Sequence, residues 1–209
     1  MASQRNRLLE IISYLESLGI KVNCGKNKAR GNKGFFRVNG NNFRIDIAEK
    51  LSEEEILKVL VHEFAHFVHY RYDKSLQSLS FIIKTREDEQ FLEELIQLTV
   101  HTIPKKSIAP LFEIKEQLQA ELKEVKSSSI PNIYQLESKQ KALRRINSRI
   151  NRLNKYYNSP TELFARSMEL YVTDRSLFVN KAPMLLQDYD EAISQNKIPE
   201  LANFIKILL

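Results

Sequence analysis

The residues best suited to chemistry in this chain are two histidines four positions apart, His62 and His66, with Glu63 between them. On an α-helix, residues i and i+4 lie on one face, so both imidazoles can reach a single metal ion. Zinc accepts imidazole and carboxylate ligands and lowers the pKa of a bound water to about 7. The pattern therefore predicts a Zn²⁺ site at His62 and His66, with Glu63 as general base toward the zinc-bound water.

The segment that carries these histidines has the pattern of a capped, buried helix. Ser52 followed by Glu55 is a capping box, and apolar residues recur at helical spacing from there to about Tyr72. The alternative is that both histidines are ordinary members of an amphipathic helix. Apolar residues on the other faces favour histidines that face a cleft.

The region upstream of this helix predicts one helix and a small sheet. Arg5–Leu18 has helical spacing, and Ile20–Asn23 is typical of a short strand. Phe35–Val38 and Phe43–Ile47 are β-type runs joined by Asn-Gly-Asn-Asn, which predicts a hairpin.

From Leu76 onward the pattern is almost wholly helical. The order of elements predicts an α+β fold in a single domain, 1–209, with a small N-terminal antiparallel or mixed sheet. Most of 76–157 is expected to be a helical insertion. The predicted helices are Leu76 to about Ile103, Pro110 to about Lys126, Pro131 to about Tyr157, Ser159 to about Val172, 183–195 and 199–208.

Composition sets broad limits on location. The chain has 209 residues, a net charge of +6 and one cysteine, Cys24. No apolar run approaches the ~20 residues of a membrane helix, and the N-terminus lacks the apolar core of a signal peptide. We therefore expect a cytoplasmic protein without a membrane partner.

A catalytic zinc needs a third protein ligand, and His69 is the nearest candidate by residue type. On a straight helix, position 69 lies about 10 Å along the axis from His62, too far for one tetrahedral ion to span. His69 is therefore expected in a cleft, at the surface, or as a hydrogen-bond donor behind the ligands. His101 is a more distant candidate, expected at a helix end near Pro104.

Residues 62–66, His-Glu-Phe-Ala-His, form an HExxH motif. The hairpin and the following helix with this motif resemble the zincin metallopeptidases over residues 35–72, and a second region of resemblance covers 156–174. The metzincin subgroup does not fit this sequence. Metzincins have a glycine and then a third histidine after the motif, and this chain has His69 and Tyr72 at those two positions. The segment 159–172 looks like the ligand helix of gluzincins, among them lethal-factor-like enzymes and phage or mobile-element relatives. This resemblance implies Glu162 as the third zinc ligand.

Other roles remain open for the residues of this second segment. Ser159 and Glu162 would also form a capping box, and Glu169, two turns along the same face, is the alternative ligand. The lethal-factor-like pattern places a tyrosine about two turns before the glutamate, where it can bind the oxyanion. Tyr156 and Tyr157 lie near that place, and the alternative for them is aromatic packing at a helix end.

The resemblance implies a zinc-dependent peptidase that cleaves one or a few specific proteins, as ImmA/IrrE-like regulators do. In zincins the sheet edge binds the peptide as an added strand, and Phe35–Ile47 is the candidate here. The basic loop 24–34 and the insertion would be recognition surfaces. The alternative function is an inactive zincin-like module that binds a protein or nucleic-acid partner through a basic helical hairpin.

Charge in the insertion is uneven. Residues 137–157 contain seven basic residues and one acid, and Arg145, Arg149 and Arg152 form a stripe at helical spacing. The preceding helix is acidic, so the two helices are predicted to pair as an antiparallel hairpin. The open alternatives are a surface for an acidic protein partner or for nucleic-acid phosphates. Of these two, nucleic acid is the less expected partner, because no nucleic-acid-binding fold signature accompanies the stripe.

Overall fold

The computed structural model describes residues 2–25, 33–73, 89–102, 105–128, 130 and 132–208. The chain divides into two compact units, one formed by 1–101 with 160–209 and the other by 102–159. We call the first the sheet unit and the second the helical hairpin. The basic segment 26–32 and residues 74–88, which include the start of the predicted insertion, lie outside the described residues.

The sheet unit contains a three-stranded mixed sheet in the order β1-β3-β2. Strand β1 (Ile20–Asn23) is parallel to β3 (Asn42–Ile47), and β2 (Gly34–Asn39) is antiparallel to β3. The predicted hairpin is confirmed, since Gly40 sits in its two-residue turn with φ of 59°. β2 is therefore an edge strand among the described strands.

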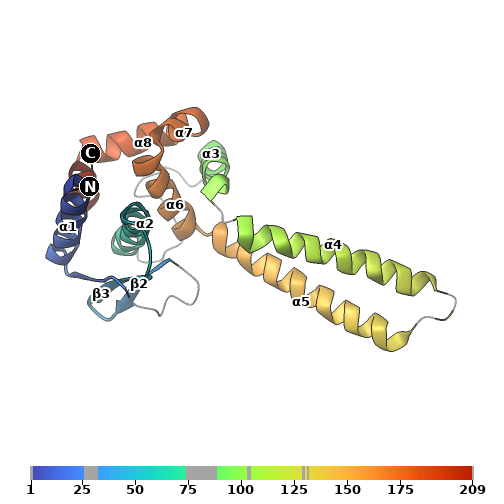
Figure 1. Cartoon of the computed structure of the whole chain (residues 1–209). Coiled ribbons are helices and arrows are strands. Elements are labelled where there is room, and N and C mark those ends of the chain that lie inside the picture. Colours follow the sequence, from blue (N-terminus) through green and yellow to red (C-terminus); the bar gives the residue numbers. More distant parts are fainter. Residues whose placement is uncertain are drawn as a thin grey trace. The chain divides into compact units, whose positions relative to one another are not determined.

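Helix α2 (Glu53–Tyr72) is the centre of the sheet unit and carries the histidine motif. The predicted capping box is present: the Ser52 hydroxyl accepts a hydrogen bond from the N–H of Glu55, whose side chain accepts one from the N–H of Ser52. The helix contacts β2 and β3 as well as α6 (Pro160–Thr173), so it is packed both on the sheet and on a later helix (Figure 1).

The other helices of the sheet unit complete its core. Helix α1 (Ala2–Ser17) packs against α9 (Pro199–Leu208). The buried Phe204 of α9 stacks on Phe64 of α2, with 4.2 Å between the ring centroids. Helix α3 packs on α6, α7 and α8, so this part of the predicted insertion belongs to the sheet unit. The short α7 was not predicted. The bounds are α1 Ala2–Ser17, α3 Glu89–Thr99, α7 Arg175–Lys181, α8 Pro183–Ser194 and α9 Pro199–Leu208.

The helical hairpin consists of two long helices that pack along each other, α4 (Lys105–Ser127) and α5 (Ile133–Tyr157) (Figure 1). Asn132 caps α5 by accepting a hydrogen bond from the N–H of Gln135. The predicted start of α4 at Pro110 is wrong, because the helix begins five residues earlier and contains that proline.

The predicted α+β class is confirmed: one small mixed sheet is combined with helices before and after it. Among the described helices, none is both long enough and apolar enough to cross a membrane.

Candidate metal centre

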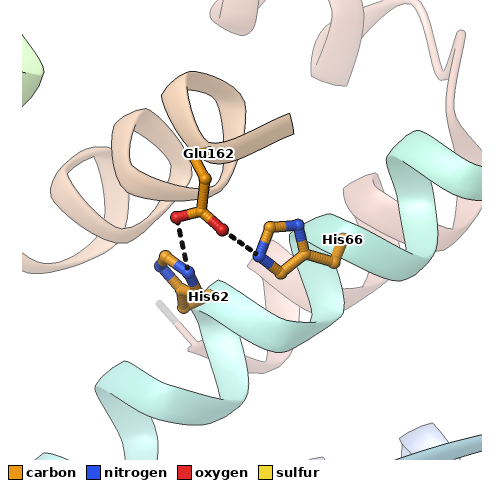
Figure 2. A group of neighbouring side chains, drawn as sticks. All are labelled: His62, His66 and Glu162. Carbon is orange, nitrogen blue, oxygen red and sulfur yellow. Dashed lines mark ion pairs between the residues drawn. The ribbon is translucent and has the colours of Figure 1, made fainter. Parts of the chain in front are cut away.

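The structure brings His62, His66 and Glu162 together from two helices. His62 and His66 lie one turn apart on α2, and Glu162 lies in the first turn of α6. The two carboxylate oxygens of Glu162 lie 3.7 Å from Nε2 of His62 and 3.3 Å from Nε2 of His66. Figure 2 shows both rings turned toward this carboxylate. The predicted ligands therefore converge although 95 residues separate the second histidine from the glutamate.

The donor set and its spacing fit zinc. Two ligand atoms bound at about 2.0–2.1 Å to a tetrahedral zinc lie about 3.3–3.5 Å apart. The three ligand atoms here lie within 4.8 Å of one another. The histidine side chains are 19% and 17% exposed, whereas that of Glu162 is 7% exposed. Protein therefore surrounds the carboxylate, and water or a substrate can approach on the histidine side.

A buried arginine holds the turn that carries Glu162. Arg166 donates from Nε to the backbone carbonyl of Glu162 at 3.3 Å and from Nη1 to the carbonyl of Thr99 at 3.2 Å. It is 3% exposed, so both bonds lie in a low-dielectric interior, where charged hydrogen bonds are strong. This contact joins the start of α6 to the end of α3 and restrains Glu162.

Glu169, the alternative ligand, contacts the other nitrogen of His62. Its Oε2 lies 3.4 Å from Nδ1 of His62. A carboxylate at Nδ1 keeps the proton on that nitrogen, which leaves the Nε2 lone pair directed at Glu162. The geometry therefore gives the two glutamates different positions: Glu162 lies among the ligand atoms, and Glu169 lies behind one of them.

Glu63 is held beside this cluster by the edge strand. Its Oε2 accepts a hydrogen bond from the backbone N–H of Phe36 at 2.7 Å. The residue is 7% exposed, and burial raises its pKa above the ordinary value of 4.5, although the nearby imidazoles of His62 and His66 act in the opposite direction. A raised pKa makes a carboxylate a stronger base near neutral pH.

Gly34 is required for this approach of β2 to α2. A Cβ at this position would lie 2.4 Å from Cγ1 of Val59 and 2.9 Å from Oε1 of Glu63. Both distances are shorter than any ordinary contact. The glycine therefore lets the first residue of the strand pass directly over the Glu63 carboxylate.

The cluster attracts positive charge. Burial lowers the pKa of the His62 imidazole, but neighbouring carboxylates outweigh this and raise the pKa above its ordinary 6.5. The carboxylates responsible are Glu169, Glu63 and Glu162. A group of three carboxylates that raises a histidine pKa also favours a divalent cation in the same place.

His69 does not lie where the sequence placed it. It is fully buried, with Nε2 3.5 Å from Oδ2 of Asp73 and its ring edge-on to Phe164 at 5.8 Å. The expectation of a cleft or surface residue is wrong, because this face of α2 packs against α6. The side chain of His101 lies outside the described residues.

Tyr156 and Tyr157 are the last residues of α5 and belong to the helical hairpin. Their rings form an edge-to-face pair with centroids 5.2 Å apart. Aromatic packing at a helix end, the alternative considered for them, is therefore present. Their role as oxyanion donors stays a prediction.

Sequence reasoning missed three contributors to this site. The Phe36 N–H has no sequence signal, because any residue supplies one. Gly34 had a weak signal, as a glycine next to a strand often marks a close backbone approach. Arg166 had a weak signal, as a charged residue directly after the apolar run 163–165.

Comparison with known proteins adds no family assignment: no protein-family model, curated protein or solved structure matches this chain. The geometry of the site is therefore the basis for assigning a function.

Proposed function

We propose that this chain is a zinc-dependent peptidase of gluzincin type. The observation that carries the proposal is the position of Glu63, whose carboxylate is fixed by the Phe36 N–H beside two imidazoles that converge on Glu162. Two histidines and a carboxylate as ligands, with a further carboxylate beside them as base, form one of the arrangements that support metal-assisted hydrolysis.

The metal would be held by His62, His66 and Glu162. A zinc ion bound there would supply Lewis-acid polarisation of a water molecule and of the substrate carbonyl. Glu169 would orient His62 through Nδ1, as carboxylates behind histidine ligands do.

Glu63 would act as the general base. Its Oε2 accepts from the Phe36 N–H, so Oε1 is the oxygen that receives the proton of the attacking water. Gly34 leaves room for Oε1, because a side chain there would collide with it. Glu63 would then deliver the same proton to the amine that leaves, and its raised pKa suits both transfers.

The edge strand supports an extended peptide as substrate. Phe36 pairs with Ile45 of β3, and its N–H points away from β3, toward Glu63. Backbone groups alternate along an antiparallel strand, so those of Val38 also point away from β3. Because Glu63 already accepts from the Phe36 N–H, a peptide added along β2 would pair with the outward groups of Val38 and with the carbonyl of Phe36, next to the general base. The substrate we propose is a specific protein in the cytoplasm, where the single cysteine, Cys24, would remain a thiol.

The test compares Glu63→Gln with Glu53→Gln, an exposed glutamate in the first turn of the same helix. Cleavage of a peptide library by the zinc-loaded protein is measured with and without a chelator. Glu63→Gln should lower turnover by about 10²–10⁴-fold while zinc content stays at the wild-type level. Glu53→Gln should leave both unchanged.

Two results would contradict the proposal. Turnover retained in Glu63→Gln would exclude Glu63 as the general base. If the protein bound zinc but cleaved no peptide or protein in a chelator-sensitive way, the result would favour the alternative function, an inactive zincin-like module that binds a partner.

A further inference from the structure

The net positive charge of this protein comes from the helical hairpin. Residues 102–159 contain 12 basic and 5 acidic residues, a net charge of +7. The remainder of the chain contains 20 basic and 21 acidic residues, a net charge of −1. The hairpin contains none of the residues to which the peptidase proposal assigns the metal or the general base. Its charge therefore calls for a separate explanation.

Within the hairpin, the charge lies on the solvent side of α5. The apolar residues at helical spacing are Leu143, Ile146, Ile150 and Leu153; Ile150 is buried and the other three are partly buried. Six basic residues are exposed, and we call them the basic face: Lys141, Arg144, Arg145, Arg149, Arg152 and Lys155. Glu137 is the one acidic residue of α5.

Pairing between the two helices does not account for the basic face. Lys139 of α5 pairs with Glu121 of α4, and Lys139 is a partly buried residue outside the basic face. Within the described part of the chain, no residue of the basic face makes an ion pair. Six exposed cations without internal partners are the feature that binding a polyanion would explain.

We propose that the basic face binds the phosphate backbone of duplex DNA. From Lys141 to Lys155 the face extends about 21 Å along the helix axis. B-DNA carries one negative charge per about 1.7 Å of its axis, so a duplex can offer a phosphate to every cation of the face. Four of the six cations are arginines, which bind phosphate with two parallel hydrogen bonds.

The neutral residues between these cations also suit phosphates. The exposed ones are Ser148, Asn151 and Asn154, whose side chains can donate hydrogen bonds to phosphate oxygens. The centres of protein–protein interfaces are usually depleted of charge and enriched in aromatic side chains. From Glu137 to Lys155, α5 exposes no such side chain, which favours nucleic acid over protein.

The form of the nucleic acid follows from the same residues. Single strands are bound by stacking on aromatic side chains, and the aromatics of α5 lie near its ends, at Tyr134, Tyr156 and Tyr157. The major groove of B-DNA admits an α-helix, whereas that of duplex RNA is too narrow. From the sequence, the stripe and its adjoining apolar seam favoured pairing with the preceding helix, and a nucleic-acid partner was the less expected alternative. The structure adds that all six cations of the basic face are exposed.

The test measures binding of the full-length protein to a fluorescent duplex DNA of about 20 base pairs and mixed sequence at several salt concentrations. With four to six phosphate contacts, affinity should fall by about 10²–10³-fold between about 50 and 200 mM salt. A flat salt titration would overturn the proposal.

Two variants of equal net charge locate the surface. Arg145→Gln with Arg149→Gln should reduce the slope of log affinity against log salt by about two. Lys123→Gln with Lys126→Gln, on the exposed side of α4, should leave that slope near the wild-type value. Equal losses in the two pairs would contradict the assignment to α5. Arg145→Lys with Arg149→Lys keeps the charge and should keep the slope, which separates charge from folding.

Competitors decide the class of partner. The bound fluorescent duplex should be displaced most effectively by unlabelled duplex DNA. Single-stranded DNA, duplex RNA and polyglutamate should each displace it less effectively at the same concentration of charge. Tighter binding of any of these would contradict duplex DNA as the occupant. Glu63→Gln should bind DNA as the wild type does, so this proposal and the peptidase proposal fail independently.

Discussion

The two units of this protein use burial and charge in opposite ways. In the sheet unit, the helix that carries His62 and His66 is packed on a sheet and on α6, within an extensive apolar core. In the hairpin, the buried apolar residues among those described are Leu111, Leu122 and Ile150, and none of them is fully buried. A metal site needs atoms held within tenths of an ångström, which a packed core provides. A surface for a polyanion needs only exposed charge on a straight helix.

The largest effect is expected from a cavity in the core of the sheet unit, next to the proposed metal site. Phe64→Ala removes a fully buried ring that stacks on Phe204, which should lower the free energy of unfolding by about 3–5 kcal/mol. Because Phe64 lies between the two histidines, zinc affinity should fall as well. Denaturant unfolding and zinc titration measure the two effects.

The matched change in the hairpin is Ile150→Ala, which removes a buried residue of α5. It should destabilise the pairing of α4 with α5 and leave zinc affinity unchanged. Loss of zinc in Ile150→Ala equal to that in Phe64→Ala would show that the two units do not separate as described.

A smaller effect is expected at the contact of β2 with α2. Gly34→Ala places a methyl group against Val59 and Glu63, which should cost about 1–3 kcal/mol of stability and reduce peptidase turnover. Gly40→Ala is the control: its φ of 59° makes alanine strained, but nothing lies within 4 Å of a Cβ there. Turnover should fall only in the first variant. Equal turnover in both would remove Gly34 from the site.

Proton competition should appear in the zinc affinity. The pKa of His62 is raised above 6.5, so in the zinc-free protein its protonated form persists to higher pH than in a free histidine. Zinc binds the neutral imidazole, so affinity should fall as pH is lowered, by about tenfold per pH unit below that pKa for each proton displaced. Calorimetric titration from about pH 8 to about pH 6 measures this. A constant affinity over that range would contradict binding through His62.

The smallest effect is expected at the surface of the hairpin. The pair with Lys139 lowers the pKa of Glu121 below its ordinary 4.5, so its stabilisation is present above that pH and is lost as pH falls through the lowered value. Because Glu121 is solvated, Lys139→Gln should barely shift the thermal midpoint at neutral pH. A large shift would show that this ion pair, and not the apolar seam, holds the hairpin together.

Local signals in the sequence predicted the elements that position the site. The capping box at Ser52 and Glu55, the Asn-Gly hairpin turn and the histidine spacing each depend on residues a few positions apart. Their physical causes are local, so sequence alone is sufficient for them.

Contacts between distant segments were harder to predict. Glu162 and Glu169 lie on one face of α6, and spacing alone did not decide which of them faces the Nε2 atoms. His69 was placed wrongly because a periodic pattern does not specify which face of α2 packs against α6. The basic stripe was recognised, but its exposure depends on how α5 packs against α4.

The most direct test of the metal centre is calorimetric titration of the metal-free protein with zinc, in the wild type and in Glu162→Ala and Glu169→Ala. One ion should bind per chain. Removal of Glu162 should weaken binding by more than about 100-fold, and removal of Glu169, which lies behind His62, by about 10–100-fold. No zinc binding by the wild type, or unchanged affinity in Glu162→Ala, would contradict the site.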